Sequence, residues 1–220
     1  IETEDPHMAP DLEAAAIKVD LSDLGLEKAP RNDLLATVGA FSGNALSGRS
    51  EAARAAMVAR HGGSAGSERA VAAALEWLAR VQCPDGGWSF DLKAHPNCRG
   101  QCGNSGSDTE ARNAATALAL LPFLKAGHTH KRGRHKETVK KGLDSLVKRI
   151  KTNPNGGSLH EPGGTMYSHG LASIALCEAY TLTKDKSLQK PAQAAINFIA
   201  YAQDPVGGGW RYQPKQAGDT

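Results

Sequence analysis

The sequence predicts an all-α protein, and three observations support this fold class. Its 220 residues are 40% hydrophobic but only 5% aromatic, and this alanine-rich composition suits closely packed helices. Apolar residues recur at the helical spacing i, i+3, i+4 and i+7, as in Val71, Ala74, Leu75 and Leu78. No stretch alternates apolar and polar residues with β-branched side chains, so the sequence gives no strand signal.

A helix that runs into a Gly-rich turn and a tryptophan occurs twice. The first copy spans Arg69–Asp91 and the second spans Lys190–Tyr212. When Gln82 is aligned with Gln203, the apolar positions coincide, and each copy ends in Gln, a Pro-containing turn, glycines and Trp. The coinciding pairs are Leu75 with Ile196, Trp77 with Phe198, and Leu78 with Ile199. Such internal repetition predicts a repeat architecture.

Amphipathic helices are predicted to form one half of each repeated unit. The first begins at Ser67, a plausible N-cap, and ends before Pro84. Residues 137–151 form a third, degenerate copy, in which Ile150 stands at the glutamine position. Ser158 and Leu159 replace the tryptophan of that copy.

Helices rich in small apolar residues are predicted to form the other half. One spans residues 108–121, begins with a capping box made by Ser107 and Glu110, and is ended or kinked by Pro122. The other spans residues 167–180 and matches the first when Asn113 is aligned with His169. Because these helices are apolar on most sides, we expect them to lie inside the amphipathic ones.

The N-terminal third has a different composition. Residues 1–66 are predicted to form a poorly structured tether with short helical turns, and residues 67–220 a repeat domain that continues beyond residue 220. Residues 1–30 hold eight acidic and two basic residues, a net charge of −6. No run approaches the roughly 18 apolar residues of a membrane span. A membrane tether through a missing N-terminal segment would still fit, and both a cytoplasmic and a cell-envelope location stay open.

The repeated turn resembles the QW repeat of squalene-hopene and oxidosqualene cyclases and the related repeat of protein prenyltransferase β subunits. The matching stretches are ALEWLARVQCPDGGW at Ala74–Trp88 and AINFIAYAQDPVGGGW at Ala195–Trp210. The resemblance implies a partial α/α toroid, in which outer and inner helices form two concentric rings around a cavity. It also implies that Gln82, Trp88, Gln203 and Trp210 are structural residues that brace helix ends.

The catalytic motifs of the resembled families are absent from this sequence. It holds no DxDD motif of the cyclases and no Asp-x-Cys zinc motif of the prenyltransferases. We therefore expect a binding or scaffold module whose cavity takes an apolar, isoprenoid-like ligand or a peptide. Two alternatives are a terpene cyclase or prenyltransferase-like enzyme whose catalytic motif lies outside this chain, and a surface domain for protein interaction.

Several polar residues are predicted to lie at the mouth of that cavity, near the starts of the inner helices. Helix N-termini gathered there would favour an anionic group such as a diphosphate, whereas the alternative is that these residues are caps and packing residues. The candidates are Asp108, Asn113, Tyr167, His169, Arg211, Tyr212 and Asp219.

A group of thiols and an imidazole is a weaker candidate for zinc. Cys98 and Cys102 form a CxxxC pair, with His95 just before it and Cys83 nearby. These donor types suit tetrahedral zinc, but the spacing differs from the usual CxxC knuckle, so a Cys98–Cys102 disulfide and free thiols are alternatives. The His-x-His of the stretch HTHKRGRH, at residues 128–135, is predicted to be a solvated loop.

Residues 125–151 are strongly basic, with ten Lys and Arg against two acids. Such a run attracts nucleic acid or lipid headgroups, but no aromatic residues interleave with these bases as stacking on single strands requires. We therefore expect a solvated helix face rather than a nucleic-acid site.

Overall fold

The computed structural model describes residues 58, 63–95, 97, 106–107 and 109–218. The chain divides into two compact units, residues 1–47 and 48–220, and all described residues belong to the second. The predicted tether therefore lies almost wholly outside the described residues. The described part is mostly helical, which confirms the all-α class. Its elements are α3 (Ala65–Arg80), η3 (Leu92–Ala94), α4 (Arg112–Lys125), α5 (Lys136–Arg149), β1 (Lys151–Asn153), β2 (Gly156–Ser158), α6 (Thr165–Thr183) and α7 (Lys186–Ala202).

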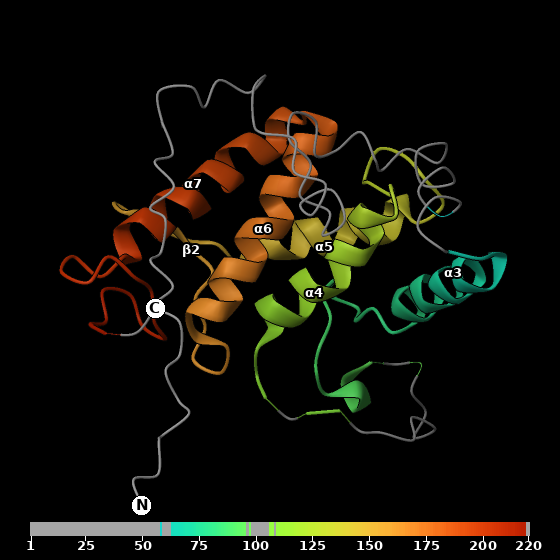
Figure 1. Ribbon diagram of the computed structural model, residues 1–220, viewed down its shortest axis with the longest axis horizontal. Coiled ribbons are helices and arrows are strands. Elements are labelled where there is room, and N and C mark those ends of the chain that lie inside the picture. Colours follow the sequence, from blue (N-terminus) through green and yellow to red (C-terminus); the bar gives the residue numbers. More distant parts are fainter. Residues whose placement is uncertain (1–57, 59–62, 96, 98–105, 108, 219–220) are drawn as a thin grey trace, which may run out of the picture. The chain divides into compact units, whose positions relative to one another are not determined.

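Helices α4 and α6 form the centre of this unit (Figure 1). They pack against each other, α5 packs on α4, and α7 packs on both α6 and strand β2. Small residues make the close contact feasible, because Ala117 on α4 and Ala172 and Ala175 on α6 are completely buried. The predicted division into small-residue helices inside and amphipathic helices outside is thus observed for these four helices.

The core is filled by larger side chains from the same helices. Leu120, Phe123 and Leu124 of α4 are fully buried, and α5 adds one apolar stripe that includes Val139 and Leu146. Burying one such side chain stabilises the fold by about 1.5–3 kcal/mol. The remaining face of α5 is polar, as its sequence period predicts.

The observed start of α3 corrects the predicted one. Ser64, not Ser67, is the N-cap, and the Ser67 hydroxyl reciprocates by accepting a hydrogen bond from the Ser64 amide, 3.0 Å between N and Oγ. The glycines around Ser64 predict a linker, and they therefore hide the capping box that Ser64 and Ser67 form.

The observed bounds of α4 correct two further predictions. Ser107 and Glu110 do not cap it: Ser107 bonds Thr109 instead, and α4 begins only at Arg112. Pro122 does not end the helix, which continues to Lys125. Helix α6 is longer than the predicted 167–180, and α7 begins before the predicted Lys190, after Asp185, whose side chain caps it.

The sequence did not predict the short antiparallel hairpin. Strand β1 pairs with β2 through the register Lys151–Ser158, Thr152–Gly157 and Asn153–Gly156. Glycine is required on β2, because a Cβ on Gly156 would lie 2.6 Å from the Ala194 carbonyl oxygen of α7. The hairpin therefore lies directly on the outer helix that follows α6.

Among the described residues, none of the helices combines the length and apolar character needed to cross a bilayer.

Two helical glycines provide a matched test of the packing. A Cβ on Gly142 of α5 would lie 2.7 Å from Leu120 and 2.8 Å from Trp88, whereas a Cβ on Gly170 of α6 would meet nothing within 4 Å. We expect Gly142→Ala to lower the free energy of unfolding by about 1–3 kcal/mol through overpacking. Gly170→Ala should raise it by about 0.5–1 kcal/mol, since alanine favours the helix. Urea unfolding measures both, and equal effects would contradict the packing described.

Candidate functional site

The two Gly-rich turns close in the same way through their glutamines. We call Gln82–Trp88 the Trp88 turn and Gln203–Trp210 the Trp210 turn. Gln82 donates from Nε2 to the Gly86 carbonyl at 2.7 Å, and Gln203 donates to the Gly208 carbonyl at 2.5 Å. Both glycines have positive φ, near 84° and 77°. Each amide thus satisfies a backbone carbonyl within the turn itself.

The two tryptophans also make matching hydrogen bonds. The indole Nε1 of Trp88 donates to the Leu78 carbonyl at 2.8 Å, and that of Trp210 donates to the Ile199 carbonyl at 2.9 Å. Leu78 and Ile199 coincide in the sequence alignment of the two stretches. Each ring therefore folds back onto the last turns of its own helix.

The Trp88 turn is covered by the helices that follow it. Trp88 is only 3% exposed, and its backbone amide donates to the Thr116 hydroxyl of α4 at 3.0 Å. Its ring lies 6.3 Å from that of Phe123. Gln82 makes a second bond, 3.0 Å to the Thr138 carbonyl of α5.

A salt-bridge network ties the same turn to α4 and α5. Asp85 accepts bonds of 2.7 Å from Arg112 and 2.6 Å from Arg149. Partial burial alone would raise the pKa of Asp85, but these bonds and the Gly87 amide outweigh it, so the pKa lies below its usual value.

The Trp210 turn is open where the Trp88 turn is covered. Trp210 is 43% exposed, and Gln203 is exposed as well. Within the described residues, neither makes a counterpart of the bonds from Trp88 to Thr116 and from Gln82 to Thr138. The covering helices are what distinguishes the two turns.

An apolar groove lies between the Trp210 turn and α6, and we call it the α6 groove. It encloses about 320 Å³, and Arg211 is the one charged residue in its lining. Tyr167 is 68% and Ile174 53% exposed. The lining residues are Met166, Tyr167, Gly170, Leu171, Ile174, Trp210, Arg211 and Tyr212.

Three residues predicted to share a rim are indeed brought together in this groove. The rings of Tyr167 and Tyr212 meet edge to face, with centroids 5.8 Å apart. The Arg211 guanidinium carbon lies 5.9 Å from the centre of the Tyr212 ring. The segment is fixed by the Met166 amide, which donates to the Tyr212 carbonyl at 3.0 Å.

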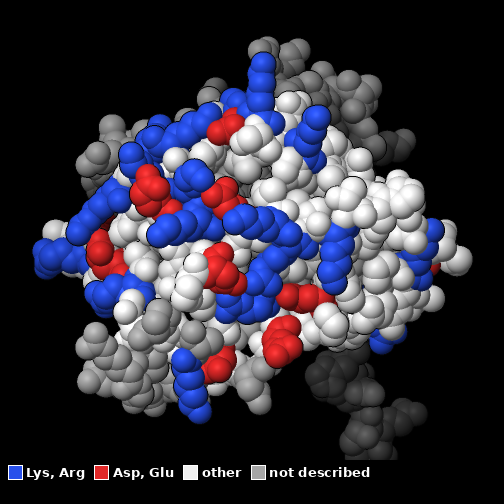
Figure 2. Space-filling view, turned by 180° about the vertical axis from the view of Figure 1, so that it is seen from behind, with Lys and Arg blue, Asp and Glu red and all other residues white. Residues whose placement is uncertain are grey.

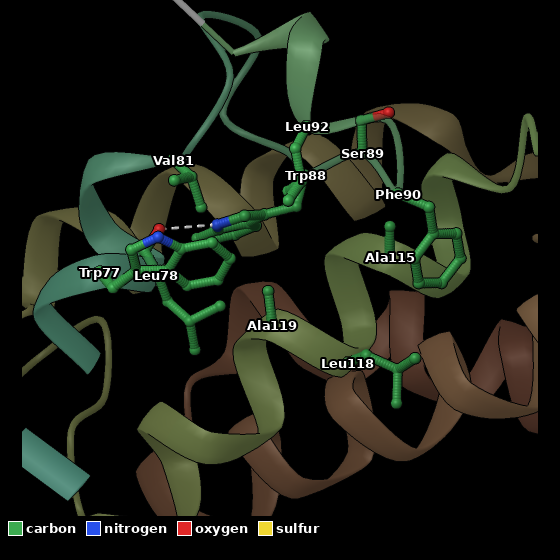
Figure 3. Close-up of a pocket in the computed structure, with 10 residues that line it drawn as sticks. All are labelled: Trp77, Leu78, Val81, Trp88, Ser89, Phe90, Leu92, Ala115, Leu118 and Ala119. Carbon is green, nitrogen blue, oxygen red and sulfur yellow. Dashed lines mark hydrogen bonds between the residues drawn. The ribbon is translucent and has the colours of Figure 1, made fainter. Parts of the chain in front are cut away.

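A second groove, the α3 groove, lies between α3, the Trp88 turn and α4 (Figure 3). It encloses about 220 Å³ and has no charged residue in its lining. Trp77 and Leu118 flank the groove from α3 and α4, and both are more than 40% exposed. The lining residues are Trp77, Leu78, Val81, Trp88, Ser89, Phe90, Leu92, Ala115, Leu118 and Ala119.

The sequence analysis missed the exposed aliphatic residues of these grooves. Leu118 and Ile174 occupy equivalent positions, since they are separated by the same 56 residues as Asn113 and His169. The sequence carries no signal that separates them from Leu120 and Leu176, which have the same spacing but are fully buried.

Asn113 and His169 are buried and hold one backbone segment between them. The Asn113 amide nitrogen Nδ2 donates to the Leu159 carbonyl at 2.9 Å, and the Leu159 amide donates to His169 Nδ1 at 3.0 Å. The imidazole proton is therefore on Nε2, which donates to the Ala195 carbonyl at 3.2 Å. Burial lowers the pKa of His169 to about 4, so the ring is neutral at pH 7. The two side chains are packing residues in the core, not part of an open cavity mouth.

The starts of α4 and α6 are already occupied by groups of the protein itself. Glu161 Oε1 accepts bonds from the amides of Asn113, at 2.8 Å, and Ala114, at 3.3 Å. At α6, the Met166 amide is taken by the Tyr212 carbonyl. The predicted anion site at these helix ends is thus filled by an internal carboxylate and a backbone carbonyl. Asp108 and Asp219, the other predicted members, lie outside the described residues.

The predicted zinc ligands are only partly described. Cys83 is a buried free thiol whose sulfur accepts a 3.3 Å bond from Arg112, and His95 is also buried. Cys98 and Cys102 lie outside the described residues. Within the described ranges, no group of three or more His, Cys, Asp or Glu side chains is arranged for a metal ion. Zinc binding by the four residues, and the alternative disulfide, stay predictions.

The loop of residues 128–135 is solvated only in part: residues 131–134 are exposed, but its two ends pack against the rest of the protein. His135 is buried against Phe123, with ring centroids 5.1 Å apart. His130 bonds Asp185, the N-cap of α7, at 2.9 Å. Thr129 is buried as well. The loop therefore packs against both the end of α4 and the start of α7. The prediction that the whole stretch is solvated is corrected at His130 and His135.

Acidic side chains interrupt the basic surface on α5 and the loop before it. Figure 2 shows Lys and Arg interspersed with Asp and Glu on the face seen from behind. Lys140 pairs with Asp144 at 2.7 Å, and Arg134 pairs with Glu76 at 3.0 Å. Such pairing is typical of a solvated helix face. The absence of a nucleic-acid partner stays a prediction.

No family model, curated protein or solved structure matches this chain.

His169 makes stability depend on pH in a defined window. Its pKa is lowered from 6.5 to about 4 in the folded state, so the unfolded chain binds the proton more readily. The stabilisation is fully present above pH 6.5, and the free energy of unfolding should fall by about 1.4 kcal/mol per pH unit from there toward pH 4. His169→Asn, which places at this site the residue that α4 carries at position 113, should remove this slope although it lowers stability at pH 7.5. Urea unfolding at several pH values measures the slope, and an unchanged slope in the variant would exclude His169 as its source.

Glu161 and Glu110 provide a matched test of the α4 cap. Glu161→Ala leaves two helix-end amides without their acceptor and should lower the free energy of unfolding by about 1–2 kcal/mol. Glu110→Ala, at the residue that the sequence assigned to the cap, should change it by less than about 0.5 kcal/mol. Thermal unfolding of both variants decides between them, and a larger loss for Glu110→Ala would restore the predicted capping box.

Proposed function

We propose that residues 63–218 are part of a binding or scaffold module built from stacked pairs of outer and inner helices. The observation that carries this proposal is a reversal of burial between α3 and α7. Phe198 of α7 is buried against α6, whereas Trp77, its counterpart on α3, is exposed. Leu75 of α3 is buried, whereas its counterpart Ile196 on α7 is exposed. The face that is exposed on α3 is therefore buried on α7, and the face that is exposed on α7 is buried on α3.

The open face of α3 contributes to the α3 groove, whereas the α6 groove is lined by α6 and by the segment after α7, with no residue of α7 itself. Trp77 lines the α3 groove, and the exposed Trp210, which follows α7, lines the α6 groove. Large exposed apolar residues gathered in grooves are typical of interaction sites on proteins. The module therefore presents one apolar surface at each end of the described array.

An arc of an α/α toroid is the architecture that we propose for this array. The matching hydrogen bonds of Gln82 and Gln203, and of Trp88 and Trp210, support a stacked arrangement of equivalent units. The resemblance of these turns to the QW repeat of cyclases and prenyltransferases agrees with it. A catalytic role of the kind found in those families stays a prediction.

A polypeptide segment is the ligand class that the groove sizes favour. Sites for small molecules usually enclose about 300–1,000 Å³ and bury most of the ligand. The two grooves, of about 220 and 320 Å³, are at or below the lower end of that range and are suited to anchoring side chains of a peptide or helix. The charge-free lining of the α3 groove supports a second candidate, a neutral isoprenoid-like chain.

Dye binding tests whether the α3 groove is a binding surface. The double variant Trp77→Gln with Leu118→Gln should lose a measurable part of the fluorescence enhancement of anilinonaphthalene sulfonate, since one of the two apolar grooves found among the described residues is removed. Val206→Gln is the control, because Val206 is 94% exposed but lines neither groove. An unchanged enhancement in the double variant would contradict the proposal.

Farnesol, a neutral isoprenoid alcohol, separates the two ligand classes in the same assay. Saturable displacement of the dye by farnesol that disappears in Leu118→Gln would favour the isoprenoid candidate for the α3 groove. If farnesol displaces no dye from the unaltered protein, the peptide class is retained.

A further inference from the structure

The covered Trp88 turn shows what kind of element fits the open Trp210 turn. At the Trp88 turn, the cover is α4, an apolar helix whose Ala115 and Ala119 let it approach closely. Its Thr116 hydroxyl accepts the backbone amide of Trp88, and Phe123 packs near the indole ring. A small-residue helix with one hydroxyl is therefore the partner to which a turn of this geometry is matched.

The backbones of the two turns are similar enough for this comparison. The Cys83 amide donates to the Gly87 carbonyl at 2.9 Å, and the Asp204 amide donates to the Gly209 carbonyl at 2.8 Å. The second turn is one residue longer, with six positions instead of five between its glutamine and tryptophan. Within the described part of the chain, the Trp210 turn thus presents the same closed turn after a helix and the same ring, without a helix that covers them.

Charge differs between the two turns and selects a different partner helix. In the covered turn, Asp85 binds Arg112 in the first turn of α4. Val206 stands at the position of Asp85 in the second turn, and Arg211 stands at the position of Ser89. The open turn therefore lacks the carboxylate of Asp85, and the one charged residue that lines the α6 groove is the cation Arg211. An acidic residue near the start of the covering helix suits this surface and the helix dipole alike.

We propose that the α6 groove is a docking site for an apolar, small-residue α-helix of a partner protein that carries an acidic residue in its first turn. The helix lies against Trp210, Ile174 and Tyr167, and its hydroxyl accepts the backbone amide of Trp210. Arg211 pairs with the acidic residue at the rim. This inference rests on the proposed binding module and adds the chemistry of the ligand at one of its two ends.

A labelled peptide with the α4 sequence is a direct probe. It spans residues 109–126, and a second peptide carries Arg112→Glu. Binding to the full chain is measured by fluorescence anisotropy and by protection of Trp210 from acrylamide quenching, in a Trp77→Phe background that removes the other exposed indole. We expect the Arg112→Glu peptide to bind about two- to fivefold more tightly than the α4 peptide at low salt, and this preference should shrink at high salt.

Variants of the groove locate the bound peptide. Trp210→Ala and Ile174→Ser should each weaken binding about tenfold or more, as expected for a central anchor of an interface. Ile174→Ser keeps the test valid if Trp210→Ala does not fold. Val206→Ser is the control, since this exposed residue lies in the Trp210 turn but outside the groove, and should leave the affinity unchanged. In the peptide, Thr116→Val removes the hydroxyl and should also weaken binding.

Three results would overturn the inference. One is unchanged affinity in both Trp210→Ala and Ile174→Ser, and another is the absence of saturation up to about 1 mM peptide. The third is self-association of the chain that Ile174→Ser abolishes, which assigns the groove to a second copy. Dye binding distinguishes a failure of the helix-docking proposal from a failure of the proposed binding module. If dye binds the α6 groove but no peptide displaces it, only the helix is wrong, whereas loss of dye binding at both grooves contradicts the proposed function.

Discussion

The close contact between α4 and α6 is the constraint on which the rest of the unit depends. Alanines at the contact let the helix backbones approach, and this approach places Asn113 and His169 on either side of the Leu159 peptide. The segment after the hairpin is thereby fixed, which in turn holds β2 against α7. A larger residue at Ala117 or Ala172 would separate the helices and disturb contacts far from the substitution.

The position of a unit within the array decides whether a side chain is buried or exposed at each pair of equivalent positions. Trp88 and Trp210 make the same bond to their own helix, yet one is buried and the other is open. The local chemistry of the turn is therefore complete without a neighbour, and burial comes only from the next helices along. The architecture combines rigid turns with apolar surfaces that other helices can cover.

The sequence predicted what depends on short-range patterns. Helix class and the division into amphipathic and small-residue helices followed from periodicity and alignment. It did not predict contacts between distant segments. The cap of α4 by Glu161 and the burial of His169 depend on how the hairpin packs, and no local motif marks them. The open grooves were missed because exposure depends on which neighbouring helices are present.

The Glu161 cap has a consequence for the order of folding. Its carboxylate reaches an amide 48 residues earlier in the chain, so the start of α4 is completed only after the hairpin and the beginning of α6 have formed. As the chain leaves the ribosome, α3 and α4 therefore remain an incomplete unit until residue 161 has emerged. Long-range closures of this kind slow folding and couple adjacent units into one cooperative transition. The starts of both small-residue helices are thus completed by later segments of the chain, α4 by Glu161 and α6 by the Tyr212 carbonyl.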